Sequence, residues 1–159
     1  MAEYHGQQRN QGPRRGHEER FPEPALDTSA VHLAPVDAEL FNGTAKMMAQ
    51  AVARADRNRN KSTQLRRFYD ELVLWETRVN QASTEQRAAK FAECLPFIRM
   101  INAKAAYAEG RKLVDSSFVK LMHDTLAQVT DPATLGTCKL FWEAFMGFYK
   151  QERQDSNTP

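Results

Sequence analysis

The sequence lacks the features of several protein classes. No apolar run approaches the roughly 18 residues of a transmembrane helix, and the N-terminal residues have no hydrophobic segment typical of a secretory signal. Two cysteines, Cys94 and Cys138, are too few for a disulfide framework, and each falls in a helical apolar pattern. We therefore expect a cytoplasmic protein with no membrane partner and with two free, buried thiols.

Motifs for catalysis and cofactor binding are also missing. The chain has no glycine-rich phosphate loop, no CxxC, no HExxH and no GxSxG. Its carboxylates fall mostly at helix caps or four residues from a base, which does not indicate a paired-acid active site. His123 has no second ligand at metal-binding spacing. We expect no enzymatic activity, no cofactor and no metal.

Proline and glycine are concentrated at one end of the chain. Residues 1–35 hold four of the seven prolines and three of the seven glycines, and their apolar residues show no period. This composition predicts a disordered or loosely docked extension. Its four arginines are interspersed with acids, so a solvated tail is favoured over a nucleic-acid contact; these arginines are Arg9, Arg14, Arg15 and Arg20.

Helical periodicity dominates residues 36–153, and nothing alternates with the period of a strand. We predict an all-α protein, a single bundle of about five helices, with a frayed C-terminus at 154–159. The helices are expected near 37–55, 60–79, 83–110, 115–130 and 131–152, and Pro96 should kink or break the third near Cys94–Leu95. The expected caps are Asp37, Ser62 or Thr63, Ser83 with Gln86, Asp115 or Ser116, and Asp131 before Pro132.

The fifth helix has an unusually wide apolar face. Its apolar residues cover about 160° of the helical wheel, more than a one-sided surface helix needs. Either this helix is central to the bundle, or another chain covers part of the face. Phe141 and Phe148 are the candidates for such a subunit interface.

Positive charge is clustered, although the net charge is only +2. Residues 54–67 contain six bases and one acid, Asp56, which gives a local charge of +5. A phosphate backbone is a natural partner for such a surface. Asp70 and Glu71 follow Arg66 and Arg67 at i+4, so two surface ion pairs are the alternative for these two arginines. The bases are Arg54, Arg57, Arg59, Lys61, Arg66 and Arg67.

A second basic segment carries an aromatic residue. Lys104, Tyr107 and Arg111 recur at i, i+3 and i+7, so they share one helix face, and Lys112 is adjacent. Cations beside an exposed ring suit a phosphate backbone with a stacking base. The alternative is a solvated face with a half-buried tyrosine.

Three motifs resemble one family. STQLRRFY at 62–69 resembles the T/S-x-Q-[IL]-R-[KR]-hydrophobic signature of the small subunit of the type III-A (Csm) CRISPR effector complex. AKAAYAEGR at 103–111 is similar to its K/Q-x-x-Y-x-x-G-R element, and LFWEAFMGFYK at 140–150 is similar to its aromatic C-terminal helix. Their order and spacing agree over about residues 37–152.

The resemblance implies a non-catalytic helical subunit of an antiviral ribonucleoprotein. Several copies would stack along the guide RNA–target RNA duplex, mainly against the target strand, beside the backbone and large subunits of the Csm complex. A protein–protein adaptor with no direct RNA contact is the alternative that the residues leave open. Together with the charge clusters, the resemblance gives the expected RNA-binding residues as Arg57, Arg59, Lys61, Arg66, Arg67, Lys104, Tyr107, Arg111 and Lys112.

Overall fold

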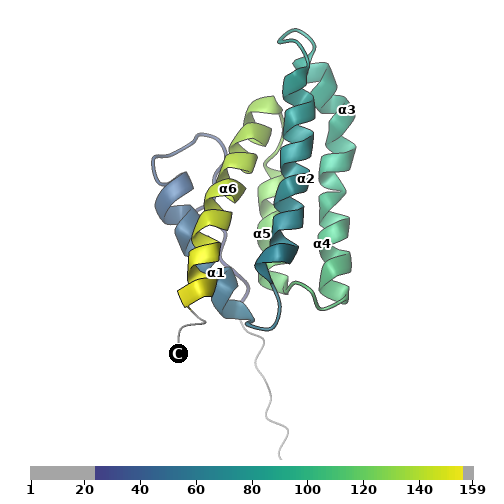
Figure 1. The fold of residues 1–159 in the computed structure, drawn as a ribbon. Helices are drawn as coiled ribbons and strands as arrows, with labels where there is room; N and C mark the ends of the chain where they lie inside the picture. The colour runs from purple at the N-terminus through teal and green to yellow at the C-terminus, as the bar shows by residue number, and fades with distance from the viewer. Residues whose placement is uncertain (1–23, 156–159) are drawn as a thin grey trace, which may run out of the picture.

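The computed structural model of the protein describes residues 24–155, and within this range it is an all-α bundle with no strand, as predicted. Residues 1–23 and 156–159 lie outside the described part, and so do the arginines expected in the N-terminal extension. Figure 1 shows the helices running roughly along one axis. In chain order they are the π-helical turn η1 (Leu40–Thr44), α1 (Ala45–Ala55), α2 (Ser62–Gln81), α3 (Arg87–Arg99), α4 (Ile101–Gly110), α5 (Ser116–Ala127) and α6 (Pro132–Asp155).

The first two predicted caps are wrong. Glu39, not Asp37, caps the first helical segment, because its carboxylate accepts from the N–H of Gly43 at 3.1 Å. Gly43 leaves space for this contact, since a Cβ there would lie 2.7 Å from the carboxylate oxygen. Neither hydroxyl near the start of α2 caps that helix; the carbonyl of Lys61 accepts the first two helical hydrogen bonds.

The third predicted helix is divided into α3 and α4, but the break falls at Met100 and not at Cys94–Leu95. The helix continues through Pro96, whose carbonyl accepts from the N–H of Met100 at 3.0 Å. Arg99 donates to the carbonyls of Leu126 at 2.5 Å and Val129 at 3.0 Å, so the break is tied to the end of α5.

The predicted capping box before α3 does not form either. Gln86 makes no side-chain cap, and its N–H donates to the carbonyl of Ser83 at 3.0 Å in a turn. The later caps are confirmed. Asp115 accepts from the N–H of Phe118 at 3.1 Å, and Asp131 accepts from the N–H of Thr134 at 2.7 Å.

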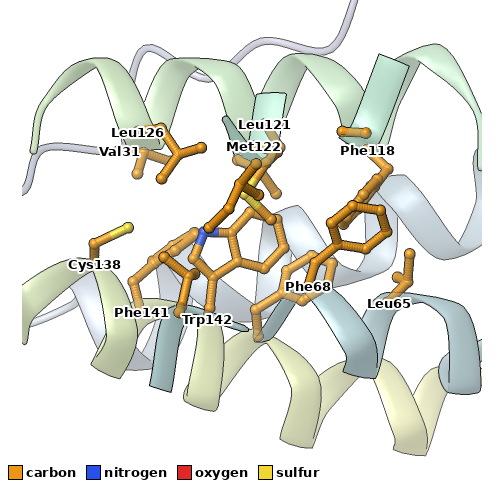
Figure 2. Close-up of a cluster of buried hydrophobic side chains, with 14 of the residues drawn as sticks. Val31, Leu65, Phe68, Phe118, Leu121, Met122, Leu126, Cys138, Phe141 and Trp142 are labelled. Carbon is orange, nitrogen blue, oxygen red and sulfur yellow. The ribbon is translucent and has the colours of Figure 1, made fainter. Parts of the chain in front are cut away.

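The helix α6 is central, which accounts for its wide apolar face. It packs against η1, α1, α2 and α3, and Figure 1 shows it between α1 and α2. Trp142 lies at the centre of the core, with Phe68 and Phe118 on one side and Phe141 on the other (Figure 2). The fully buried side chains of α6 are Leu135, Cys138, Phe141, Trp142, Phe145 and Tyr149.

The segment before η1 is docked on the bundle, so the prediction of a loosely ordered extension through residue 35 is too broad. Val31 and Leu33 are only 2% and 1% exposed. Gln128, the C-cap of α5, accepts from the N–H of Leu33 at 2.9 Å and donates to the carbonyl of Val31 at 2.8 Å. Thr28 donates to Asp124 at 2.6 Å.

The hydrogen-bonded carboxylate of Asp124 should make the free energy of unfolding depend on pH. Burial opposes ionisation of Asp124, but hydrogen bonds from Lys120, Thr28 and His123 outweigh it and lower the pKa from 3.8 to about 2. Because the pKa of Asp124 is lower in the folded state, the ionised carboxylate stabilises the fold at pH values above its unfolded-state pKa. This contribution is lost as the pH falls through the folded-state pKa. Asp124→Asn should therefore cost about 1 kcal/mol at neutral pH, after solvent screening is considered.

The cost of Asp124→Asn should disappear between about pH 4 and pH 2, as measured by urea unfolding across that range. Asp70→Asn, which removes an exposed partner of Arg66, is the control and should cost a few tenths of a kcal/mol. A cost for Asp124→Asn that stays constant down to pH 2 would contradict the prediction.

Candidate nucleic-acid interface

The linker between α1 and α2, residues 56–61, is closely folded. The carboxylate of Asp56 accepts from the N–H groups of Asn58 at 2.8 Å and Arg59 at 3.2 Å, which is an Asx-type turn. Its other oxygen lies 3.2 Å from Nε of Arg59. Arg57 and Lys61 are exposed and Arg59 is half-buried. The linker therefore presents its cations from a defined backbone.

Arg153 of α6 holds this linker in place. Its guanidinium donates to the carbonyls of Asp56 at 2.9 Å, Arg57 at 3.0 Å and Arg59 at 2.8 Å, and its Nε donates to the hydroxyl of Tyr149 at 2.9 Å. The planar guanidinium suits this arrangement because its donors diverge in fixed directions.

Sequence reasoning missed the roles of Arg153 and Tyr149. The hydroxyl of Tyr149 donates to the carbonyl of Asn60, and burial raises the pKa of this tyrosine, against the opposing effect of Arg153. The carbonyls that accept from these two residues lie 89 to 97 residues earlier in the chain. The one local signal is the i,i+4 spacing of Tyr149 and Arg153 at the end of an apolar stripe.

Asn60 connects the linker to the loop between α4 and α5. Its backbone N–H donates to the carbonyl of Leu113 at 3.0 Å, and its side-chain oxygen accepts from the N–H of Asp115 at 2.9 Å. Asn60 is fully buried and has a φ of 56°, in the left-handed region that asparagine tolerates better than most residues. The two loops therefore meet at one end of the bundle, the lower end in Figure 1.

This connection brings two basic segments together that are about 50 residues apart in the chain. Arg111 and Lys112 immediately precede Leu113, and both are exposed. Lys112 also has a positive φ, 59°, where the chain turns out of α4. We define the basic end of the bundle as five residues: Arg57, Arg59, Lys61, Arg111 and Lys112.

One of the two predicted i,i+4 ion pairs on α2 forms. Arg66 lies 2.7 Å from Asp70, whose hydrogen bond raises the pKa of the guanidinium, and both side chains are more than half exposed. Arg67 is exposed and has no ion-pair partner among residues 24–155. The predicted pair of Arg67 with Glu71 is wrong, because Glu71 pairs with Lys104 of α4 at 2.6 Å.

Tyr107 is 68% exposed, which rules out the alternative of a half-buried tyrosine. The guanidinium of Arg111 lies 5.8 Å from its ring centroid, within the range of a cation–π contact. The exposed ring is available for stacking. It lies one helical turn from Lys104, on the same face of α4.

Comparison with known proteins identifies the chain at the family level. A family model described as Csm2 Type III-A matches residues 36–155, most of the chain. The chain belongs to the Csm2 type III-A family. No curated protein and no solved structure is significantly similar to it. The range agrees with the one expected from the three motifs.

Csm2 family membership makes the chain a structural subunit of the type III-A CRISPR effector complex, in which the other Csm subunits are its partners. The three Csm2-like motifs lie on different parts of the bundle. One begins α2, one covers most of α4, and one is the central part of α6. All three carry exposed cations, and the third also supplies Phe141, Trp142, Phe145 and Tyr149 to the core.

The predicted subunit-interface residues of this Csm2 chain have different environments. Phe141 is fully buried and lies edge-on to Trp142 at a centroid distance of 5.9 Å, so it is a core residue and not a surface contact. Phe148 is half-buried and packs against the core from the surface of α6. The sequence pattern could not separate them because both lie on the same wide apolar face.

Cys94 and Cys138 are buried and free, and burial raises the pKa of the Cys138 thiol to about 12. Residues 24–155 contain no group of three or more His, Cys, Asp or Glu residues able to hold a metal ion. No helix in this range has the length and apolar character needed to cross a membrane.

Proposed function

We propose that the chain is a non-catalytic RNA-binding subunit of a type III-A effector ribonucleoprotein, acting in the cytoplasm in defence against viruses and plasmids. Several copies would stack along the duplex of guide RNA and target RNA. The observation that carries the proposal is the joining of two basic segments at one end of the bundle by the hydrogen bonds of Asn60.

The charge arrangement supports contact with a phosphate backbone. Three of the nine predicted RNA-binding residues are in ion pairs within the subunit: Arg59, Arg66 and Lys104. The other five cations have no ion-pair partner in residues 24–155: Arg57, Lys61, Arg67, Arg111 and Lys112. Contacts of this kind read shape and charge, which suits a complex whose sequence specificity comes from base pairing with the guide.

Replacing Arg66, Arg67 and Arg111 by alanine together tests the proposal. We expect the dependence of log affinity on log salt for single-stranded RNA to flatten by about 2, because each lost phosphate contact contributes about 0.7. Thermal stability should change little, because all three side chains are exposed. The measurement is fluorescence anisotropy across a salt series, with a thermal melt of the same samples.

A second triple variant, Lys46, Arg78 and Lys90 to alanine, removes the same charge at positions away from these three arginines and from the basic end, and should keep the slope of the unmodified chain. Equal flattening in both triple variants would show that net charge alone binds RNA. Unfolding of the arginine variant would show that its arginines are structural.

A protein–protein adaptor is the second candidate. It is favoured by large apolar side chains at the surface of α2, of α3 and of the residue that follows α3: Leu74, Phe97 and Met100 are 45%, 47% and 46% exposed. Phe97 stacks on Trp75 at a centroid distance of 5.2 Å, so its ring is held against α2. A gel-shift series decides between the two: no RNA affinity at low salt, in any oligomeric state, would favour the adaptor.

A further inference from the structure

A groove of about 880 Å³ lies between the first half of α2 and the second half of α6. It extends as far as Arg153, whose guanidinium holds the linker of the basic end, so the groove continues from that end. The residues that the argument uses are Arg66, Arg67, Tyr69, Met146, Gly147 and Lys150.

The rim of this α2/α6 groove has an excess of positive charge. Its two acids are already paired: Asp70 with Arg66 at 2.7 Å, and Glu143 with Lys139 at 3.3 Å. Arg67 and Lys150 are exposed on opposite walls, and neither has an ion-pair partner in the part of the chain that the structure describes. An occupant with a negative charge would complement this rim.

Tyr69, Met146 and Gly147 line the groove without carrying charge, and we call them its floor. Tyr69 and Met146 are half-buried, and Gly147 is exposed. A Cβ added at Gly147 would meet no heavy atom within 4 Å, so the floor is open above this residue. A planar ring can rest on such a floor while an attached phosphate reaches the rim.

We propose that the α2/α6 groove receives an unpaired nucleotide of the bound RNA. Its base lies against Tyr69, Met146 and Gly147, and its flanking phosphates lie beside Arg67 and Lys150. This inference rests on the proposed RNA-binding function. The competing occupant is an amphipathic helix of another protein; RNA is favoured because the unpaired cations of the groove are continuous with those of the basic end.

Filling the groove tests the inference. Gly147→Leu places a side chain on the open floor, and Gly136→Leu is the matched control on the same helix. Gly136 also has no heavy atom within 4 Å of an added Cβ, and it does not line the groove. Both changes replace glycine by a better helix former, so both variants should melt at or above the temperature of the unmodified chain.

Binding is measured by fluorescence anisotropy at low salt, with oligouridine RNA and with an abasic strand of the same length. We expect Gly147→Leu to bind oligouridine about tenfold more weakly than Gly136→Leu, the range of one lost base contact. The two variants should bind the abasic strand equally, because the cations of the rim are kept. If Gly147→Leu does not fold, Lys150→Ala should lower the salt slope by about 0.7.

Three results would overturn the inference. If the two glycine variants bind oligouridine equally, the inference about the groove is wrong, but the proposed function is unaffected. If Gly147→Leu keeps its RNA affinity but no longer co-purifies with another Csm subunit, a segment of that subunit and not RNA occupies the groove. No RNA binding by any form of the full chain at low salt would overturn the proposed function as well.

Discussion

Trp142→Ala is expected to lower the free energy of unfolding by about 4 kcal/mol, in the range for removing a large buried aromatic residue. Trp142 is 1% exposed, and its ring lies 4.8 Å from Phe145 and 5.7 Å from Phe118 between centroids. Its indole N–H donates to the hydroxyl of Thr125 at 3.1 Å, so alanine also leaves a buried acceptor without its donor. Urea unfolding followed by circular dichroism measures the loss.

Two further variants test whether the loss in Trp142→Ala comes from removing a large buried side chain. Trp142→Phe keeps most of the apolar volume and should lose about half as much stability as the alanine variant. Leu74→Ala removes an apolar side chain that is 45% exposed, and should cost less than 1 kcal/mol. Similar small losses in Trp142→Ala and Leu74→Ala would contradict the central position of α6 in the core.

Arg153→Ala is expected to release the linker of the basic end and to cost about 2 kcal/mol of stability, typical of hydrogen bonds from a charged donor. The carbonyls of Asp56, Arg57 and Arg59 lose their donor together. Amide hydrogen exchange across residues 57–65 should become faster. RNA affinity should also fall, because the linker cations are then presented from a mobile backbone.

Two variants distinguish the hydrogen-bond geometry of Arg153 from its charge. Arg153→Lys keeps the charge, but an ammonium on a flexible stem cannot reproduce three divergent donors, so the linker amides should still exchange faster. Lys150→Ala, on the same helix, removes an exposed charge and should leave linker exchange unchanged. Arg153→Lys with the exchange rates of the unmodified chain would show that charge alone holds the linker.

The arrangement around Arg153 also explains how a subunit with a net charge of only +2 presents a basic surface. The linker carbonyls accept hydrogen bonds from Arg153 and Tyr149 of α6, and the side chains of Arg57 and Lys61 remain exposed. Preorganised cations lose less conformational entropy on binding than cations on a mobile loop. The basic end is therefore a property of the packed end of α6 as well as of the linker sequence.

The sequence by itself determined the local interactions of the chain. Asp115 and Asp131 cap their helices as predicted, because each partner N–H lies three residues away. The apolar stripe of α2 is buried as its 3.6-residue period indicated, with Leu65, Phe68 and Leu72 in the core. The three motifs also placed the chain in its family before any contact between helices was known.

Only the tertiary structure decided which elements meet. An amphipathic pattern shows which face of a helix is apolar but not what covers it, so Phe141 was assigned to an interface although it is in the core. Glu71 pairs with Lys104 across two helices, in preference to Arg67 in its own helix. Asn60 joins two basic segments over 55 residues. These contacts depend on the packing of distant segments, which the local spacing of side chains does not specify.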